Sequence, residues 1–138
     1  MMSSVQGTGS ARPSQVTLFL VLFKELAQDR FKFVDRQGSL ETIAQLGITV
    51  AQAKQEILGL TYQDYYRGPL PDLDHQGEKF WEFGRIISGK EVFIKLKAKV
   101  EQGIALCFSF HVPEKPMQYP YGQGSTRQKR GGATKEVE

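Results

Sequence analysis

The chain has 138 residues, 40% of them hydrophobic, with a single cysteine and a formal net charge of +3 at pH 7. This length accommodates one domain with an ordinary core, and no run approaches the roughly 20 apolar residues that a membrane-spanning helix needs. One cysteine excludes an internal disulfide and a cysteine-rich zinc site, so we expect neither metal nor cofactor. The mildly basic charge permits a polyanionic partner without establishing one.

The first segment, residues 1–13, is rich in Ser and Gly and lacks an apolar period, so we expect a disordered N-terminal arm. The apolar run that follows lacks the basic region and the small-residue cleavage site of a signal peptide. We therefore expect a cytoplasmic protein. Ser14 is a good N-cap, and the apolar periodicity after it predicts a helix over residues 15–29.

A short strand is predicted at residues 31–34 from their aromatic and β-branched composition, followed by a turn at 35–38. Ser39 then favours the start of a short helix. Gly47 is a suitable residue for its C-terminal end.

A capping box formed by Thr49 and Gln52 predicts a further helix over residues 50–58. An extended piece, residues 65–70, comes next. Its prolines cannot donate hydrogen bonds to a sheet, so we expect this piece at a sheet edge.

From residue 79 the apolar period becomes two, which is typical of strands. Three strands are predicted, at residues 79–88, 91–101 and 104–111, joined by loops at Gly89-Lys90 and Gln102-Gly103. With the preceding helices they predict an α+β fold over residues 14–111, in which an antiparallel sheet packs against the N-terminal helices. Residues 112–138 are Pro/Gly-rich and basic, and we expect a partly disordered tail.

The middle strand separates its side chains between two faces. The apolar face predicts the core: Val92, Ile94, Leu96, Ala98 and Val100. The polar face carries the remaining residues: Glu91, Phe93, Lys95, Lys97 and Lys99. If Gly89-Lys90 is a two-residue hairpin loop, Glu82 faces Lys97 and Gly84 faces Lys95, whereas Trp81 lies on the core side.

The last strand has an apolar set that we expect in the core: Ile104, Leu106, Phe108 and Phe110. This requires a three-residue loop ending in a bulge at Gly103. Lys95 then lies opposite His111, and Lys97 opposite Ser109. The polar face thereby collects ionisable side chains from three strands, although alternating lysines are more often a solvated outer face, and Trp81 and the nearby tyrosines are more often packing residues.

An ordered set of short motifs resembles the MqsR family of toxins, the mRNA interferases of a type II toxin–antitoxin system. The motifs are LGITVAQAKQEILGL (46–60), DYYR (64–67), WEFG (81–84), KEVFIKL (90–96) and SFH (109–111). The resemblance implies a RelE-like fold and metal-independent endoribonuclease activity on single-stranded mRNA. It also implies neutralisation by a cognate antitoxin with a helix-turn-helix DNA-binding region.

The resemblance also implies site residues. The family's catalytic positions match Arg67, Glu82, Phe93 and His111, and Tyr66 matches a flanking aromatic. Arg67 stands where the family usually has Lys. In the best-known member the other three positions hold Gln, Tyr and Lys, so the cleavage specificity cannot be carried over.

RNA cleavage without a metal needs a base for the 2′-hydroxyl, an acid for the leaving oxygen and cations on the phosphate. Glu82 and His111 are candidates for base and acid, in either order. Arg67 and Lys95 are candidate phosphate stabilisers. The RNA-binding candidates are Tyr66, Phe93, Lys97 and Trp81.

Two other functions are consistent with the sequence. Phe93 lacks a hydroxyl, so the domain could bind RNA without cleaving it. Alternatively, the edge piece at residues 65–70 and the C-terminal tail could bind a protein partner by strand addition.

Overall fold

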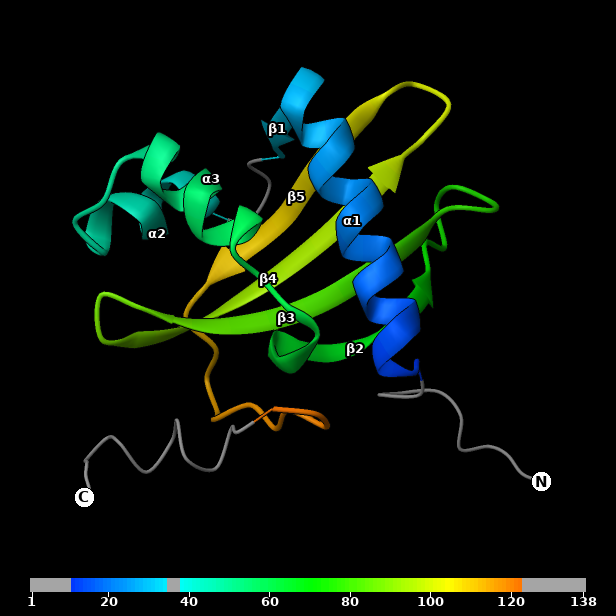
Figure 1. Cartoon of the computed structure of the whole chain (residues 1–138). Helices are drawn as coiled ribbons and strands as arrows, with labels where there is room; N and C mark the ends of the chain where they lie inside the picture. Colours follow the sequence, from blue (N-terminus) through cyan, green and yellow to red (C-terminus); the bar gives the residue numbers. More distant parts are fainter. Residues whose placement is uncertain (1–10, 35–37, 123–138) are drawn as a thin grey trace.

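The computed structural model describes residues 11–34 and 38–122. Within them, the helices α1 (Pro13–Asp29), α2 (Ser39–Gln45) and α3 (Val50–Leu58) cover one face of a five-stranded sheet, and α1 lies across that face (Figure 1). The predicted α+β fold, with N-terminal helices on the sheet, is confirmed. None of the described helices is both long and apolar enough to cross a membrane.

Of the N-caps predicted from the sequence, that of α3 is confirmed. The Thr49 hydroxyl accepts a hydrogen bond from the Gln52 backbone amide, and the Gln52 side-chain oxygen accepts one from the Thr49 backbone amide. Ser39, predicted as a cap, is instead the first residue of α2, after the N-cap Gly38. The prediction that Ser14 caps α1 is wrong. The helix begins two residues earlier than predicted, at Pro13, which is favoured in the first turn because it has no N–H to satisfy.

The sheet has the strand order β1-β5-β4-β3-β2. Its strands are β1 (Phe31–Phe33), β2 (Tyr65–Pro71), β3 (Lys79–Ile87), β4 (Lys90–Lys99) and β5 (Ile104–His111). The predicted meander of β3, β4 and β5 is confirmed as antiparallel, and β1 pairs with β5 in parallel. The strand β2, preceded by the short 3-10 helix η2 (Tyr62–Asp64), forms an edge as expected.

The hairpin between β3 and β4 turns one residue earlier than predicted. Ser88 and Gly89 both have positive φ, 53° and 80°, as a two-residue hairpin turn requires. Glu82 therefore faces Lys95 rather than Lys97, and Gly84 faces Phe93. The predicted register is wrong by two residues, and because side chains alternate with period two, every side chain keeps its predicted face.

The register between β4 and β5 changes inside the strands and not at their loop. Lys95 pairs with Ser109 but Leu96 pairs with Cys107, so Phe108 is the extra residue of a bulge. The predicted core set is consequently wrong for Ile104 and Phe108, which are half-buried, whereas Leu106 is buried but on the side of the sheet away from the helices. Ala105 and Cys107 join the core on one side of the bulge and Phe110 joins it on the other, whereas Phe108 contacts Lys97 on the opposite face. The end of β4 was also misplaced, since Val100 is 56% exposed.

The core lies between α1 and the sheet. Phe19 stacks on Trp81 with 4.7 Å between ring centroids, and Phe23 is fully buried beside it. Each buried phenylalanine contributes roughly 1.5–3 kcal/mol, which makes this contact a major source of stability. At the other end of β3, Arg85 donates to Glu56 at 2.9 Å and so ties α3 to the sheet.

Candidate nucleic-acid interface on the open face of the sheet

The sheet face that the helices leave uncovered, here called the open face, collects most of the predicted site residues. Glu82, Lys95 and Ser109 lie on one rung across three strands, and Phe93 and His111 lie on the next rung. Arg67 pairs with Glu82 from the edge strand β2. The meander therefore brings these side chains together because strand register fixes their neighbours.

Arg67 and Glu82 form an ion pair at one side of this face. Nε of Arg67 donates to Oε1 of Glu82 at 2.8 Å, and Glu82 is only 4% exposed. The hydrogen bond to Glu82 raises the pKa of Arg67. Because 38% of the Arg67 side chain remains exposed, its guanidinium is still accessible to an anion.

An aromatic cluster continues the face beyond this ion pair. The ring of Phe93 lies 6.4 Å from that of Tyr66 and 5.1 Å from that of His111, and all three side chains are half-buried. Arg67 lies over the Tyr66 ring at 5.3 Å. Half-buried rings beside cations form a surface on which unstacked nucleobases can stack.

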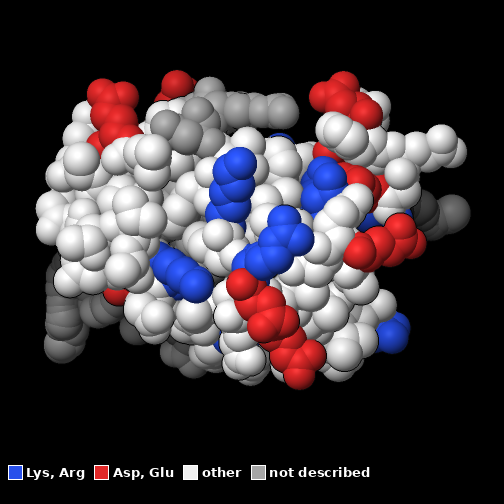
Figure 2. Space-filling view, turned by 90° about the horizontal axis from the view of Figure 1, so that it is seen from above, with Lys and Arg blue, Asp and Glu red and all other residues white. Residues whose placement is uncertain are grey.

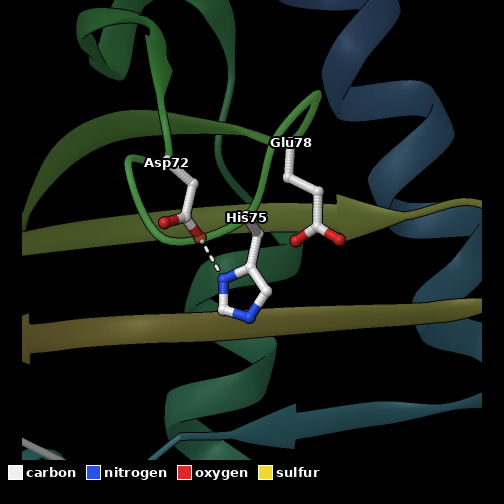
Figure 3. Close-up of side chains that lie close together, drawn as sticks. All are labelled: Asp72, His75 and Glu78. Carbon is white, nitrogen blue, oxygen red and sulfur yellow. Dashed lines mark hydrogen bonds and ion pairs between the residues drawn. The ribbon is translucent and has the colours of Figure 1, made fainter.

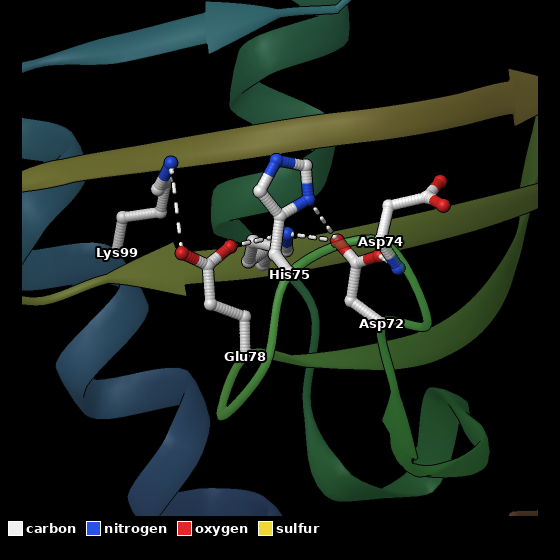
Figure 4. A network of polar contacts seen from close by, with 6 residues as sticks. Asp72, Asp74, His75, Glu78 and Lys99 are labelled. Carbon is white, nitrogen blue, oxygen red and sulfur yellow. Dashed lines mark hydrogen bonds and ion pairs between the residues drawn. The ribbon is translucent and has the colours of Figure 1, made fainter.

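Lys97 does not belong to this accessible surface. It is 1% exposed, donates to Asp72 and to Glu78 (2.7 Å for Glu78), and lies against the rings of Phe80 and Phe108. Figure 4 shows the two acids within this polar network. The hydrogen bond from Lys97 lowers the pKa of both carboxyl groups. The ammonium thus holds the β2–β3 loop, residues 72–78, against one end of the open face.

The same loop contains a trio of metal-ligating residue types. One donor atom each from Asp72, His75 and Glu78 lies within 4.8 Å of the others, and His75 Nδ1 is 3.2 Å from Asp72 Oδ2 (Figure 3). Both carboxylates, however, already accept from Lys97. Their two negative charges are balanced by Lys97 and by Lys99, which lies 3.7 Å from Glu78, so we assign this trio to holding the loop.

A C-terminal segment, residues 112–122, covers the opposite end of the open face. Met117 and Tyr119 are buried, and the Glu91 carboxylate accepts from the Met117 amide at 3.1 Å and from the Tyr119 hydroxyl at 2.5 Å. Both side chains lie against Gly84, where a Cβ would come within 2.9 Å of the Met117 sulfur. These residues, predicted as tail, are therefore part of the folded unit; residues 123–138 lie outside the described part of the chain.

The structure thus places seven of the eight predicted site residues on the open face: Tyr66, Arg67, Glu82, Phe93, Lys95, Lys97 and His111. Lys97 is on this face but buried under the loop. Trp81 is on the helix side, stacked on Phe19. The role of Asp72 was missed, and its only sequence signal was an acidic loop opposite a lysine-rich strand.

Charge on the molecule is not concentrated in one basic patch on the face seen in Figure 2. Lys and Arg side chains there are separated by uncharged atoms and by neighbouring acidic side chains. On this side of the molecule, nucleic-acid contact would therefore depend on a few placed cations rather than on a broad positive field.

Comparison of the chain with models of known protein families, with curated proteins and with solved structures found no match. The resemblance to the MqsR toxins therefore depends on the short motifs alone.

Proposed function

We propose that this protein is a toxin-type endoribonuclease that binds single-stranded mRNA across the open face and cleaves it without a metal. The observation that supports it best is the position of Lys95, which pairs with Glu82 on β3 and lies one rung away from His111 at the end of β5. An aromatic cluster for base stacking adjoins them.

The strand geometry suits a phosphodiester lying over Lys95. Glu82 and His111 are two strands and one rung apart, so their backbones are separated by about 12 Å. One of them removes the proton of the 2′-hydroxyl, whose oxygen attacks phosphorus. The other protonates the departing 5′-oxygen, which leaves a cyclic phosphate on one product and a hydroxyl on the other.

Arg67 and Lys95 supply the cations for this step. Charge accumulates on the non-bridging oxygens as the attacking oxygen joins phosphorus, and positioned cations stabilise that charge. The Glu82 pairing fixes the Arg67 guanidinium in place before RNA arrives. We further propose that the activity acts in the cytoplasm and that a cognate antitoxin with a helix-turn-helix region neutralises it.

Purified protein incubated with single-stranded RNA in EDTA tests the proposal. Wild type should cleave, and Arg67→Ala and His111→Ala should each cut the rate by roughly a hundredfold or more, the contribution typical of one acid–base or electrostatic group. Lys79→Ala is the matched control, because Lys79 is exposed and lies on the helix side of the sheet. Absence of cleavage by wild type, or full cleavage by both site variants, would reject the catalytic role.

A second candidate is RNA binding without cleavage. Phe93 occupies the centre of the aromatic cluster and has no hydroxyl to take part in proton transfer or phosphate binding. Salt-dependent RNA binding that Arg67→Ala weakens, with no product from any RNA tested, would favour this function over the first.

A further inference from the structure

A recess beside the candidate site is formed where the β2–β3 loop, residues 72–78, folds over the open face. Its volume is about 210 Å³, and it is lined by Asp72, Asp74, His75, Phe80, Lys95, Phe108 and Ser109. This is smaller than the 300 Å³ or more usual for a whole small-molecule ligand, so the recess suits a single ring system. Lys95 and Ser109 belong to both the recess and the candidate site.

The recess presents polar groups that have no partner among the described residues. Ser109 is 4% exposed, and its hydroxyl makes no hydrogen bond within residues 11–34 and 38–122. Asp74 uses its backbone amide to donate to Asp72, while its carboxylate points away from the Lys97 network (Figure 4). The Ser109 hydroxyl is not fully enclosed, and because it lines the recess it can form a hydrogen bond with a ligand or with water there.

The charges of the recess decide what class of ligand fits. Asp72 is already paired with Lys97, so one acid, Asp74, and one base, Lys95, are the main charged groups left to face the recess. A phosphate would be attracted by Lys95 but opposed by the Asp74 carboxylate. A neutral ring that donates hydrogen bonds is favoured instead. Phe80 and Phe108 supply apolar walls, with 5.0 Å between their ring centroids.

From these observations we infer that the recess is a base-selecting subsite, which takes a nucleobase bearing an exocyclic amino group and disfavours uracil. The amino group donates to the Asp74 carboxylate, as cytosine does to acidic side chains in DNA complexes. Uracil has a carbonyl oxygen at the position of the cytosine amino group, and that oxygen would face a carboxylate. This inference rests on the proposed RNA-binding function.

Fluorescence anisotropy with short oligo(C) and oligo(U) of equal length, in EDTA, tests the subsite. Wild type should bind oligo(C) more tightly by roughly threefold to tenfold, the factor that one hydrogen bond supplies. Asp74→Ala should remove that preference while leaving oligo(U) binding unchanged or stronger. Ser109→Ala provides a second variant within the recess, and Glu101→Ala, an exposed acid in the β4–β5 loop, is the charge-matched control.

The outcomes separate this inference from the proposed function. Equal binding of both oligomers, or a preference that survives Asp74→Ala, overturns the subsite and leaves the RNA function standing. Wild type that binds neither oligomer removes both. Circular dichroism of each variant verifies folding, which we expect to persist because the Asp74 side chain is exposed.

Discussion

The ammonium nitrogen of Lys97 lies 2.7 Å from Oε1 of Glu78, and it also donates to Asp72. Lys97 is buried and fixed on β4, whereas both acids lie at the ends of a polar loop. A charge removed from water in this way depends on its partners. The loop and the strand should therefore be stable only together.

Replacing Lys97 with Met is expected to lower the free energy of unfolding by about 3 kcal/mol, because two acids then lose their shared cation. Urea denaturation measures the change. Lys79→Met, an exposed lysine, should change stability by no more than about 0.5 kcal/mol. Adding Asp72→Asn and Glu78→Gln to the Lys97→Met variant should restore part of the lost free energy of unfolding. If it restores none, the packing of the lysine stem, and not its charge, stabilises the fold.

The free energy of unfolding should also fall at acidic pH, because the ion pairs of Lys97 with Asp72 and Glu78 are lost when the two acids are protonated. The pKa values of Asp72 and Glu78 are lowered in the folded state by Lys97. Their contribution is therefore complete above the unfolded pKa values, near pH 4, and is lost as the pH falls through and below that range. The urea midpoint of the wild type should drop between about pH 5 and pH 2. An Asp72→Asn, Glu78→Gln variant should show a shallower drop, and an identical pH profile would contradict this origin.

Substituting Gly84 with Ala should displace the C-terminal segment, residues 112–122. The added methyl group would meet the ends of the Tyr119 and Met117 side chains, which can move away only by leaving the sheet. We expect a loss of about 1–2 kcal/mol, typical of overpacking, and faster limited proteolysis within the segment. In a Tyr119→Ala, Met117→Ala background the same substitution should have little further effect.

The turn between β3 and β4 offers a stabilising change. Ser88 has a φ of 53°, a conformation that Asn adopts more readily, and Asn-Gly is the favoured pair for this turn. Ser88→Asn should raise the free energy of unfolding by about 0.5 kcal/mol. Ser88→Val should lower it, since a β-branched residue is strained there. Thermal denaturation of both variants measures the difference.

Local sequence patterns predicted the parts of this fold that depend on neighbours along the chain. The capping box of Thr49 and the alternation of β4 both have local causes, and both predictions are confirmed. The bulge at Phe108 could not be predicted in the same way. Apolar side chains occupy both faces of β5, so alternation alone left its register open.

The sequence predicted those residues of the candidate site whose positions are set by strand pairing. Glu82, Lys95 and His111 share a face because of pairing, and a two-residue error in the hairpin left that face unchanged. The burial of Lys97 depends on Asp72, which is 25 residues away in sequence, in a loop without regular structure. A contact between a strand and an irregular loop leaves no hydrophobic periodicity in the sequence from which it could be predicted.

The end of the described chain is joined to its beginning. The Tyr121 hydroxyl donates to the Ala11 carbonyl oxygen at 2.5 Å, and its ring stacks on Tyr65, whose hydroxyl accepts from the Ala11 amide. A truncation that removes Tyr121 would therefore remove a contact to Ala11, 110 residues earlier in the sequence, and the first turn of α1 should fray. A phenotype produced by deleting the C-terminus cannot, for this reason, be assigned to the deleted residues alone.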